Sequence, residues 1–150
     1  MKTLLAFTIA VITVAGTGLV MAEKVDTPGK GLREEATHIV TGEVAAIYQR
    51  RETVGDWRYT RYCAEVRISK VEKDAGKDLA KDGLVYVRYW RRSWVGDGPM
   101  PPSTSGHRGL PKAGENLRIY LARNAYDGFT FDNKDGGYNV LGANGFEKLP

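Results

Sequence analysis

The sequence predicts an all-β domain built as a small Greek-key barrel of five to six strands. Several segments alternate apolar and polar residues with a period of two, as half-buried strands do. Eighteen glycines favour many turns, and no long amphipathic helix interrupts the strands. With 150 residues, 42% of them hydrophobic and 27% charged, the composition is that of an ordinary globular protein and excludes a wholly disordered chain.

Residues 1–22 have the layout of a secretory signal peptide. Lys2 precedes an apolar run from Leu4 to Val14, and small residues lead to a cleavage site after Ala22. The apolar run is shorter than the roughly 20 residues of a transmembrane helix, so we expect no membrane span after cleavage. The sequence therefore predicts an exported protein, periplasmic or extracellular.

The mature chain is expected to begin with a flexible arm, residues 23–36, which is rich in charge and glycine and shows no apolar period. The barrel domain then covers 37–150. Its first strand is predicted over Ile39–Tyr48, and one face carries Val40, Gly42, Val44, Ala46 and Tyr48. Gly42 favours a bend or a close approach of another backbone.

A long second strand is predicted from Trp57 to Val71, after a turn at Val54-Gly55-Asp56. One face of this strand carries Tyr62, Ala64, Val66 and Ile68. The opposite face carries Arg61, Cys63, Glu65, Arg67 and Ser69. Val71 falls out of phase, which predicts a bulge or the end of the strand near Lys70.

The remaining segments complete the all-β pattern. Residues 73–83 allow a helical turn at most, Leu84–Arg92 is a third strand and Ser93–Gly114 a long loop. In the fourth strand, Leu117, Ile119 and Leu121 point inward while Arg118 and Tyr120 point outward. A final hairpin is expected with Phe129, Phe131, Tyr138 and Val140 around the turn Asn133–Gly137.

This strand count, with one long second strand, favours an OB-like barrel, the five-stranded Greek-key type. Three segments also resemble the netrin-like domains and tissue inhibitors of metalloproteinases, a secreted OB-fold pattern shared with exported bacterial proteins. They are Ile39-Val40-Thr41-Gly42-Glu43-Val44, Ala64-Glu65-Val66 and Leu110–Leu121 with its Gly114-Glu115 turn. The resemblance covers about residues 37–123 and implies a fold.

The resemblance does not extend to protease inhibition. Those inhibitors begin with a cysteine whose amino group reaches the protease zinc, whereas the expected mature start here is Glu23. Cys63 is the only cysteine, so no internal disulfide can form. We expect Cys63 to be a small structural strand residue, and the alternative is a disulfide between two chains.

The third strand holds the most suggestive pattern, with Tyr86, Arg88, Trp90 and Arg92 alternating on one face. Aromatic rings stack on sugars or bases, and guanidinium groups pair with phosphate, sulfate or carboxylate. Arg58 and Arg61 are expected to extend this face, and Trp94 and His107 to edge it. The structural alternative is an exposed sheet face stabilised by stacking of arginine on aromatic rings.

We therefore predict a non-enzymatic, envelope-associated or secreted binding protein whose ligand is a polyanionic glycan or polymer. Nucleic acid is a poor candidate, because an exported protein seldom meets it. A first alternative is a protein-binding, inhibitor-like module that docks on a secreted enzyme through the loop Trp94–Pro102, since Trp, Tyr and Arg dominate interfaces.

A second alternative is a small hydrolase that uses Ser103 or Ser105 with His107 as base and Asp97 as its partner. The chain lacks the glycine pattern of a nucleophile elbow, which disfavours this alternative. The oxygen-rich run Asp132–Gly137 lacks the spacing of a calcium loop and is interpreted as a turn. We expect no cofactor and no metal.

Overall fold

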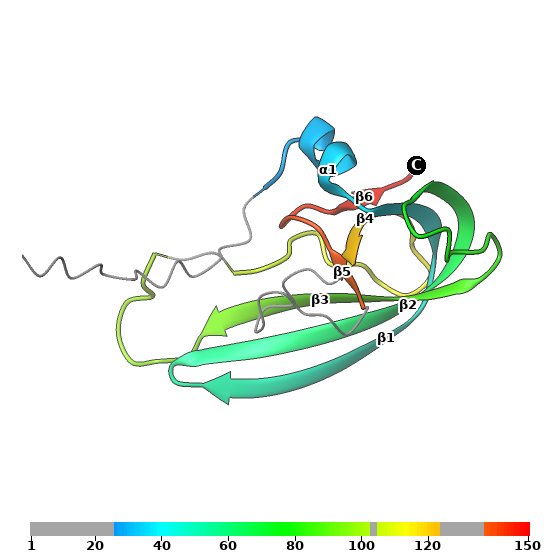
Figure 1. The fold of residues 1–150 in the computed structure, drawn as a ribbon. Coiled ribbons are helices and arrows are strands. Elements are labelled where there is room, and N and C mark those ends of the chain that lie inside the picture. The colour runs from blue at the N-terminus through cyan, green and yellow to red at the C-terminus, as the bar shows by residue number, and fades with distance from the viewer. Residues whose placement is uncertain (1–25, 103–104, 124–136) are drawn as a thin grey trace, which may run out of the picture.

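The computed structural model describes residues 26–102, 105–123 and 137–150, which form one six-stranded mixed sheet and one short helix. The elements are α1 (Gly29–Glu35), β1 (His38–Val54), β2 (Trp57–Asp74), β3 (Leu84–Trp94), β4 (Asn116–Arg123), β5 (Tyr138–Val140) and β6 (Phe146–Lys148). The sheet order is β1-β2-β3-β5-β4-β6, and β4 also pairs with β1. Five strands therefore form a near-closed ring, seen at the right of Figure 1.

β5 joins the two halves of this ring. It runs parallel to β3, with Val87 opposite Tyr138, and antiparallel to β4, with Leu121 opposite Val140. The predicted hairpin is therefore replaced, for its described part, by a strand between β3 and β4. Phe129, Phe131 and most of the turn from Asn133 lie outside the described residues.

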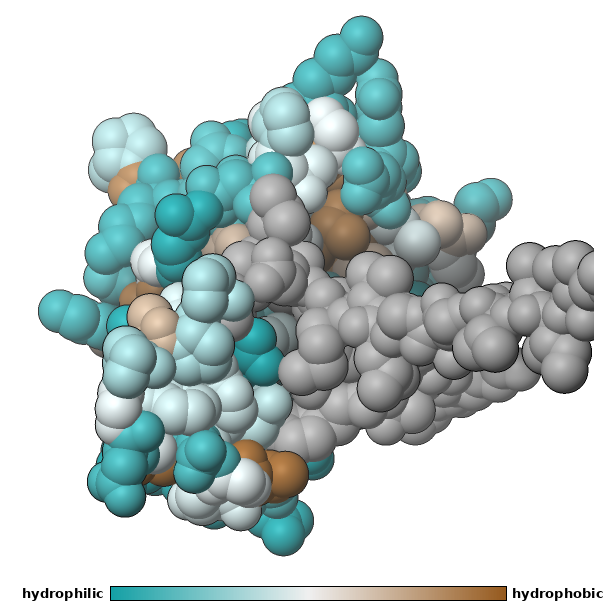
Figure 2. Space-filling view, turned by 90° about the vertical axis from the view of Figure 1, so that its left-hand side faces the viewer, coloured by the Kyte–Doolittle hydropathy of each residue, from teal (hydrophilic) through white to brown (hydrophobic). Residues whose placement is uncertain are grey.

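The far halves of β1, β2 and β3 extend beyond the ring as a three-stranded ribbon (Figure 1). We define the ribbon as residues 48–62 and 88–95. β1 continues to Val54 and not to Tyr48 as predicted, because it pairs with β2 up to the turn between Val54 and Trp57. Figure 2 views the molecule from this end, where hydrophilic residues dominate the described surface and hydrophobic ones are scattered.

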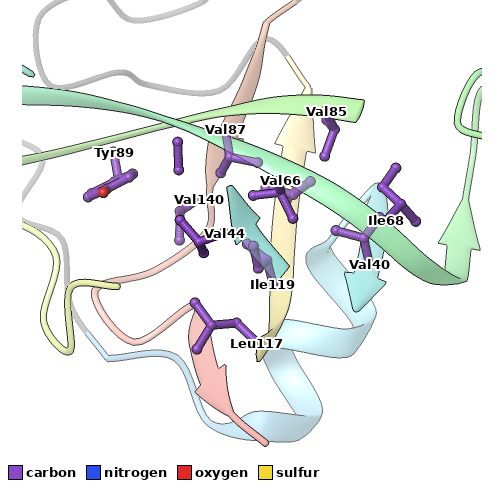
Figure 3. Packing of buried hydrophobic residues seen from close by; sticks show 12 residues of the cluster. Val40, Val44, Val66, Ile68, Val85, Val87, Tyr89, Leu117, Ile119 and Val140 are labelled. Carbon is purple, nitrogen blue, oxygen red and sulfur yellow. The ribbon is translucent and has the colours of Figure 1, made fainter. Parts of the chain in front are cut away.

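The core fills the inside of the ring (Figure 3). The inward face predicted for the fourth strand is confirmed, with Leu117 and Ile119 fully buried. The predicted alternation of the second strand is also confirmed, since Ala64 and Val66 of one face are fully buried, as is Val87 of β3. In β1, Val40 and Val44 are buried as predicted, but Tyr48 is 56% exposed. A register shift between Val44 and Ala46 reverses the alternation, so that Ile47 packs on the core instead.

Irregular pairing lets β1 contact two strands at once. The register shifts between Ile39 and Val40 and between Thr41 and Gly42, which confirms the predicted bulge near Lys70. A side chain at Gly42 would lie 2.3 Å from the Arg67 carbonyl oxygen. The expected close backbone approach at Gly42 is therefore confirmed, and it requires glycine.

The predicted flexible arm is wrong for residues 29–36. α1 packs Leu32 and Ala36 against Ile39 and Tyr120, forming a second small cluster. This contact also explains why Tyr120, predicted to point outward, is only 4% exposed: it does leave the ring interior, but α1 covers it. Burial of this cluster offsets the entropy lost by ordering the segment. Residues 23–25 and the predicted signal peptide lie outside the described residues.

A polar network on the outside of the ring connects five elements through Glu72 of β2. Its Oε1 accepts hydrogen bonds from Arg118 Nε of β4 at 2.9 Å and from Thr41 of β1 at 3.1 Å. Arg33 of α1 lies 3.7 Å from Oε2, and Arg118 also donates to Glu147 of β6. Burial alone would raise the pKa of Glu72, but the hydrogen bonds from Arg118 and Thr41 outweigh it and lower the pKa.

This network predicts a pH-dependent loss of stability in Glu72→Gln. A lowered pKa in the folded state contributes stability above the ordinary carboxylate pKa, and that contribution disappears as the pH falls through the lowered value. We expect the variant to lose roughly 2 kcal/mol of unfolding free energy at neutral pH. The gap should close as the pH falls from about 5 towards about 2. Urea denaturation across this range measures it, with the exposed Glu34→Gln as control; a gap that does not depend on pH would contradict the assignment.

Candidate functional site

The structure separates the predicted binding residues, Arg58, Arg61, Tyr86, Arg88, Trp90, Arg92, Trp94 and His107, into several environments. Arg61 pairs across the strands with Trp90, so those two do share the outer face of the ribbon. Arg58 pairs with Ser93 and, by the alternation of side chains, points to the opposite, core-side face. The prediction that Arg58 extends the Trp90 face is therefore wrong.

Trp90 and Arg92 are too buried to form the exposed face expected of them. Trp90 is 2% exposed and Arg92 8%. The Arg92 guanidinium lies 4.4 Å from the centre of the Trp57 ring, and its Nη1 donates to the Tyr59 hydroxyl at 3.4 Å. The segment at Gly106 packs so closely on the Trp90 ring that a side chain there would clash. For these two residues the structural alternative, stacking within the sheet, is the one observed.

Tyr86 and Arg88 line a cleft of about 440 Å³ at the side of the ring. Tyr86 is 53% exposed, whereas Arg88 donates from Nε to the buried Asn139 Oδ1 of β5 at 3.0 Å. Arg88 therefore contributes to the junction of β3 and β5 as well as to the cleft wall. The same cleft is lined by Asp78 and Tyr138, which no sequence pattern had connected with β3.

Cys63 lies between Tyr48 and Arg88 in one row of the outer face, where it lines this cleft and a neighbouring one of about 290 Å³. Burial raises the pKa of its thiol, which disfavours the reactive thiolate. This agrees with the structural role expected for it.

Trp94 stands at the tip of the ribbon. Its ring packs edge-on against Trp57, with centroids 5.1 Å apart, and its Nε1 donates to the Gly98 carbonyl at 3.2 Å. Both rings are partly exposed, so the tip has an aromatic surface. Trp94 was predicted to lie at the edge of the binding face.

His107 is 1% exposed and serves as a structural clip. Its Nε2 lies 3.0 Å from the Val140 carbonyl oxygen. Its Nδ1 lies 3.1 Å from the Trp90 backbone nitrogen and 3.0 Å from the Trp90 carbonyl oxygen. Backbone groups engage both ring nitrogens, which disfavours His107 as the base of a hydrolase. His107 does line a cleft beside β3, together with Arg91 and Arg108. Ser103 lies outside the described residues, and Ser105 is exposed.

The core-side face of the ribbon carries exposed arginines instead. Arg51 and Arg91 stand on either side of Thr60 in one cross-strand row, and Arg58 lies one row nearer the tip. All three side chains are exposed, and among the described residues no ion pair or hydrogen bond engages their guanidinium groups. Alternation along β3 alone could not reveal this face, because its three arginines belong to three different strands.

This face continues into a cleft of about 300 Å³ between β3 and the segment that follows the proline-rich loop. Arg91, Ser105 and Arg108 line the cleft, and Arg108 also forms an ion pair with Asp26. A backbone bridge between Arg91 and Gly106 holds the two walls together. Arg91 therefore belongs both to the core-side face and to the cleft, and Arg108 lines the same cleft.

A second polar site lies at the end of the ring away from the ribbon, where His38 Nε2 faces Asp74 Oδ1 at 3.2 Å and Asp78 Oδ1 at 3.1 Å. His38 is 1% exposed. No local sequence pattern connects this cluster, because His38 precedes the two aspartates by more than thirty residues and only the pairing of β1 with the end of β2 brings them together.

Asp78 also binds through its other oxygen, which accepts the Tyr138 hydroxyl at 2.8 Å and pairs with Arg123. The hydrogen bond from Tyr138, with help from His38 and Arg123, lowers the pKa of Asp78. Burial and the neighbouring carboxylate raise the pKa of Tyr138 to about 12. At neutral pH, Asp78 is therefore an ionised acceptor and Tyr138 a donor.

The burial of His107 predicts that His107→Ala loses about 2–4 kcal/mol of unfolding free energy, because it leaves a cavity and an unpaired carbonyl. The neighbouring exposed Ser105→Ala should be nearly neutral. Urea unfolding followed by tryptophan fluorescence measures both. Equal stability of the wild type and His107→Ala would contradict the structural role.

Among the described residues, no helix is long and apolar enough to cross a membrane. Comparison of the chain with protein-family models, with curated proteins and with solved structures finds no match. An assignment of function therefore depends on the charge, exposure and geometry of the sites described above.

Proposed function

We propose that this chain is an exported, non-enzymatic accessory protein that binds a polyanionic glycan along the core-side face of its ribbon. The observation that carries the proposal is the concentration of charge. The ribbon holds seven arginines and only two acidic residues, Glu52 and Asp56, a formal charge of +5, whereas the whole chain carries +4. The positive charge of the protein is thus collected in one region, which attracts polyanions.

Arginine is suited to this role because its planar fork pairs with sulfate, carboxylate or phosphate through two parallel hydrogen bonds. Arg51, Arg58 and Arg91 offer exposed guanidinium groups on one surface, and Arg108 continues it across the cleft. Their spacing over two rows of three strands suits an extended chain with repeated negative charges better than a single small anion.

The arrangement of the strands supports the same location. We propose that the near-closed ring belongs to the OB type, whose oligonucleotide- and oligosaccharide-binding surface is formed by strands two and three and by the loop between strands one and two. Here the ribbon supplies both, because β2 and β3 form its middle and edge and the turn at Gly55-Asp56 forms its tip. The expected export of the chain favours a glycan of the envelope or the extracellular matrix over nucleic acid.

Titration with heparin tests the proposal, with uncharged dextran as the control ligand. All three tryptophans, Trp57, Trp90 and Trp94, lie in the ribbon, on the face opposite Arg51, Arg58 and Arg91, so their fluorescence reports on the same strands. Released counterions make polyanion binding weaken with salt, and we expect the logarithm of the affinity to fall linearly with the logarithm of salt concentration.

The variant that combines Arg51→Gln, Arg58→Gln and Arg91→Gln should lose most of this affinity and about three units of the salt slope. A matched variant removes the same charge elsewhere through Lys70→Gln, Lys77→Gln and Lys81→Gln, all exposed residues outside the ribbon. It should bind almost as the wild type does. If both variants lost the same affinity for heparin, binding would depend on net charge alone, and the proposed site would be contradicted.

A protein partner remains the second candidate because of the ribbon tip. Val54 and Val95, which adjoin the Trp57–Trp94 pair, are exposed, and so is Met100 in the loop that follows. Binding through this tip would bury apolar surface and depend little on salt. Absence of salt-dependent binding to heparin, together with a salt-insensitive partner lost in Trp94→Ala, would favour this candidate over the glycan.

A further inference from the structure

We propose that His38, Asp74 and Asp78 bind a divalent transition-metal ion such as Zn²⁺ at the end of the ring away from the ribbon. One donor atom from each side chain, His38 Nε2 and the two Oδ1 atoms, lies within 4.8 Å of the others. One imidazole nitrogen and two carboxylate oxygens form a donor set that zinc accepts, with a fourth position left for water or a ligand. The proposal is independent of glycan binding.

Three backbone segments deliver these donors. His38 is the first residue of β1 and faces the ring interior opposite Leu121, while Asp74 ends β2 opposite His38. The loop after β2 then returns Asp78 to the same point, because Asp74 accepts the backbone N–H groups of Asp78 and Leu79 at 3.2 and 2.9 Å. The site therefore depends on pairing already needed for the fold.

Each carboxylate is held by contacts that leave one oxygen directed at His38. Asp78 uses Oδ2 for Tyr138 and Arg123, which leaves Oδ1 facing Nε2. Asp74 accepts the Leu79 N–H through Oδ2, while its Oδ1 accepts the Asp78 N–H and also faces Nε2. The ligand oxygens are thus fixed by partners outside the proposed coordination sphere, as in established metal sites.

His38 is fixed in the same manner. Its Nδ1 lies 2.8 Å from Thr37 Oγ1, which also receives the Arg123 backbone N–H at 3.0 Å and lies 3.3 Å from the Leu121 carbonyl oxygen. With Nδ1–H donating to Thr37 and the threonine hydroxyl donating to Leu121, every group is satisfied and Nε2 offers its lone pair to a cation. A second polar partner of this kind orients the ring of a metal-bound histidine.

Electrostatics favours a cation at this point. Two carboxylate oxygens converge on one buried nitrogen, which offers at most one hydrogen and cannot satisfy both equally. Like charges this close repel unless a positive charge lies between them. Arg123 pairs with Asp78 only through Oδ2, the oxygen that points away from His38. A divalent ion among the three donors would neutralise the negative charge that remains on the two carboxylates.

A metal here would join the start of β1, the end of β2 and the loop that follows. It would stabilise the folded protein, because the unfolded chain does not bring the three ligands together. Asp78 and Tyr138 also line the cleft of about 440 Å³, so the fourth coordination position is reachable from solvent.

Cobalt titration of the purified, EDTA-treated protein tests the proposal. We expect a saturable 1:1 visible absorption typical of a low-symmetry Co²⁺ site, its displacement by Zn²⁺, and a higher melting temperature with Zn²⁺ than with EDTA. Interference from other ligands is limited, because the only other histidine, His107, is buried with both ring nitrogens engaged. Absence of Co²⁺ absorption together with an unchanged melting temperature in Zn²⁺ would overturn the proposal.

Asp78→Asn should weaken Zn²⁺ binding roughly tenfold or more, since it removes one charged ligand but keeps an oxygen for Tyr138. The control is Asp82→Asn, an exposed aspartate in the same loop at φ 63°, a conformation that asparagine tolerates. It should bind Zn²⁺ as the wild type does. If Asp78→Asn does not fold, judged by circular dichroism, Asp74→Asn replaces it. Wild-type affinity in a folded Asp78→Asn or Asp74→Asn would overturn the proposal.

Discussion

The fold depends on the double pairing of the first part of β1, which contacts β2 on one side and β4 on the other. A strand with two partners in a small ring must bend sharply. β2 carries an extra residue opposite the Ile39–Val40 and Thr41–Gly42 steps, and β1 itself carries one between Val44 and Ala46. Gly42 lies where the opposing backbone leaves no room for a side chain. Once β1 is bent, β4 faces β5, β5 faces β3, and the apolar residues of five strands share one interior (Figure 3).

Closure of the ring also creates the ribbon. β4 leaves β1 after Glu43, and β1, β2 and β3 continue beyond it as the ribbon (Figure 1). Both faces of the ribbon carry arginines and aromatic rings. On the outer face Arg92 is buried by stacking on Trp57, whereas Arg50 is exposed. On the core-side face Arg51, Arg58 and Arg91 are all exposed, and they form the proposed glycan surface.

The two ends of the ring are closed by different chemistry. At the ribbon end, Tyr62 stacks on Tyr89 with centroids 4.9 Å apart, Phe146 packs edge-on against Tyr89, and His107 joins β3 to the end of β5. At the other end, the aspartates, Tyr138 and Arg123 surround His38. The aromatic end needs only burial to be stable. The polar end requires every group to find a partner, which is why it is the place to look for an ion.

Sequence alone determined the β class, the alternation of β2 and β3, the inward face of β4, the bulge near Lys70 and the close approach at Gly42, because these follow from local alternation and glycine geometry. It missed α1, whose single buried leucine gives no periodic signal, and the reversal of β1 faces at the Val44 bulge. It also placed Trp90, Arg92 and His107 on a surface. Only the tertiary structure decided which arginines reach solvent and that His38 meets Asp74 and Asp78, because exposure and convergence depend on strands far apart in the chain.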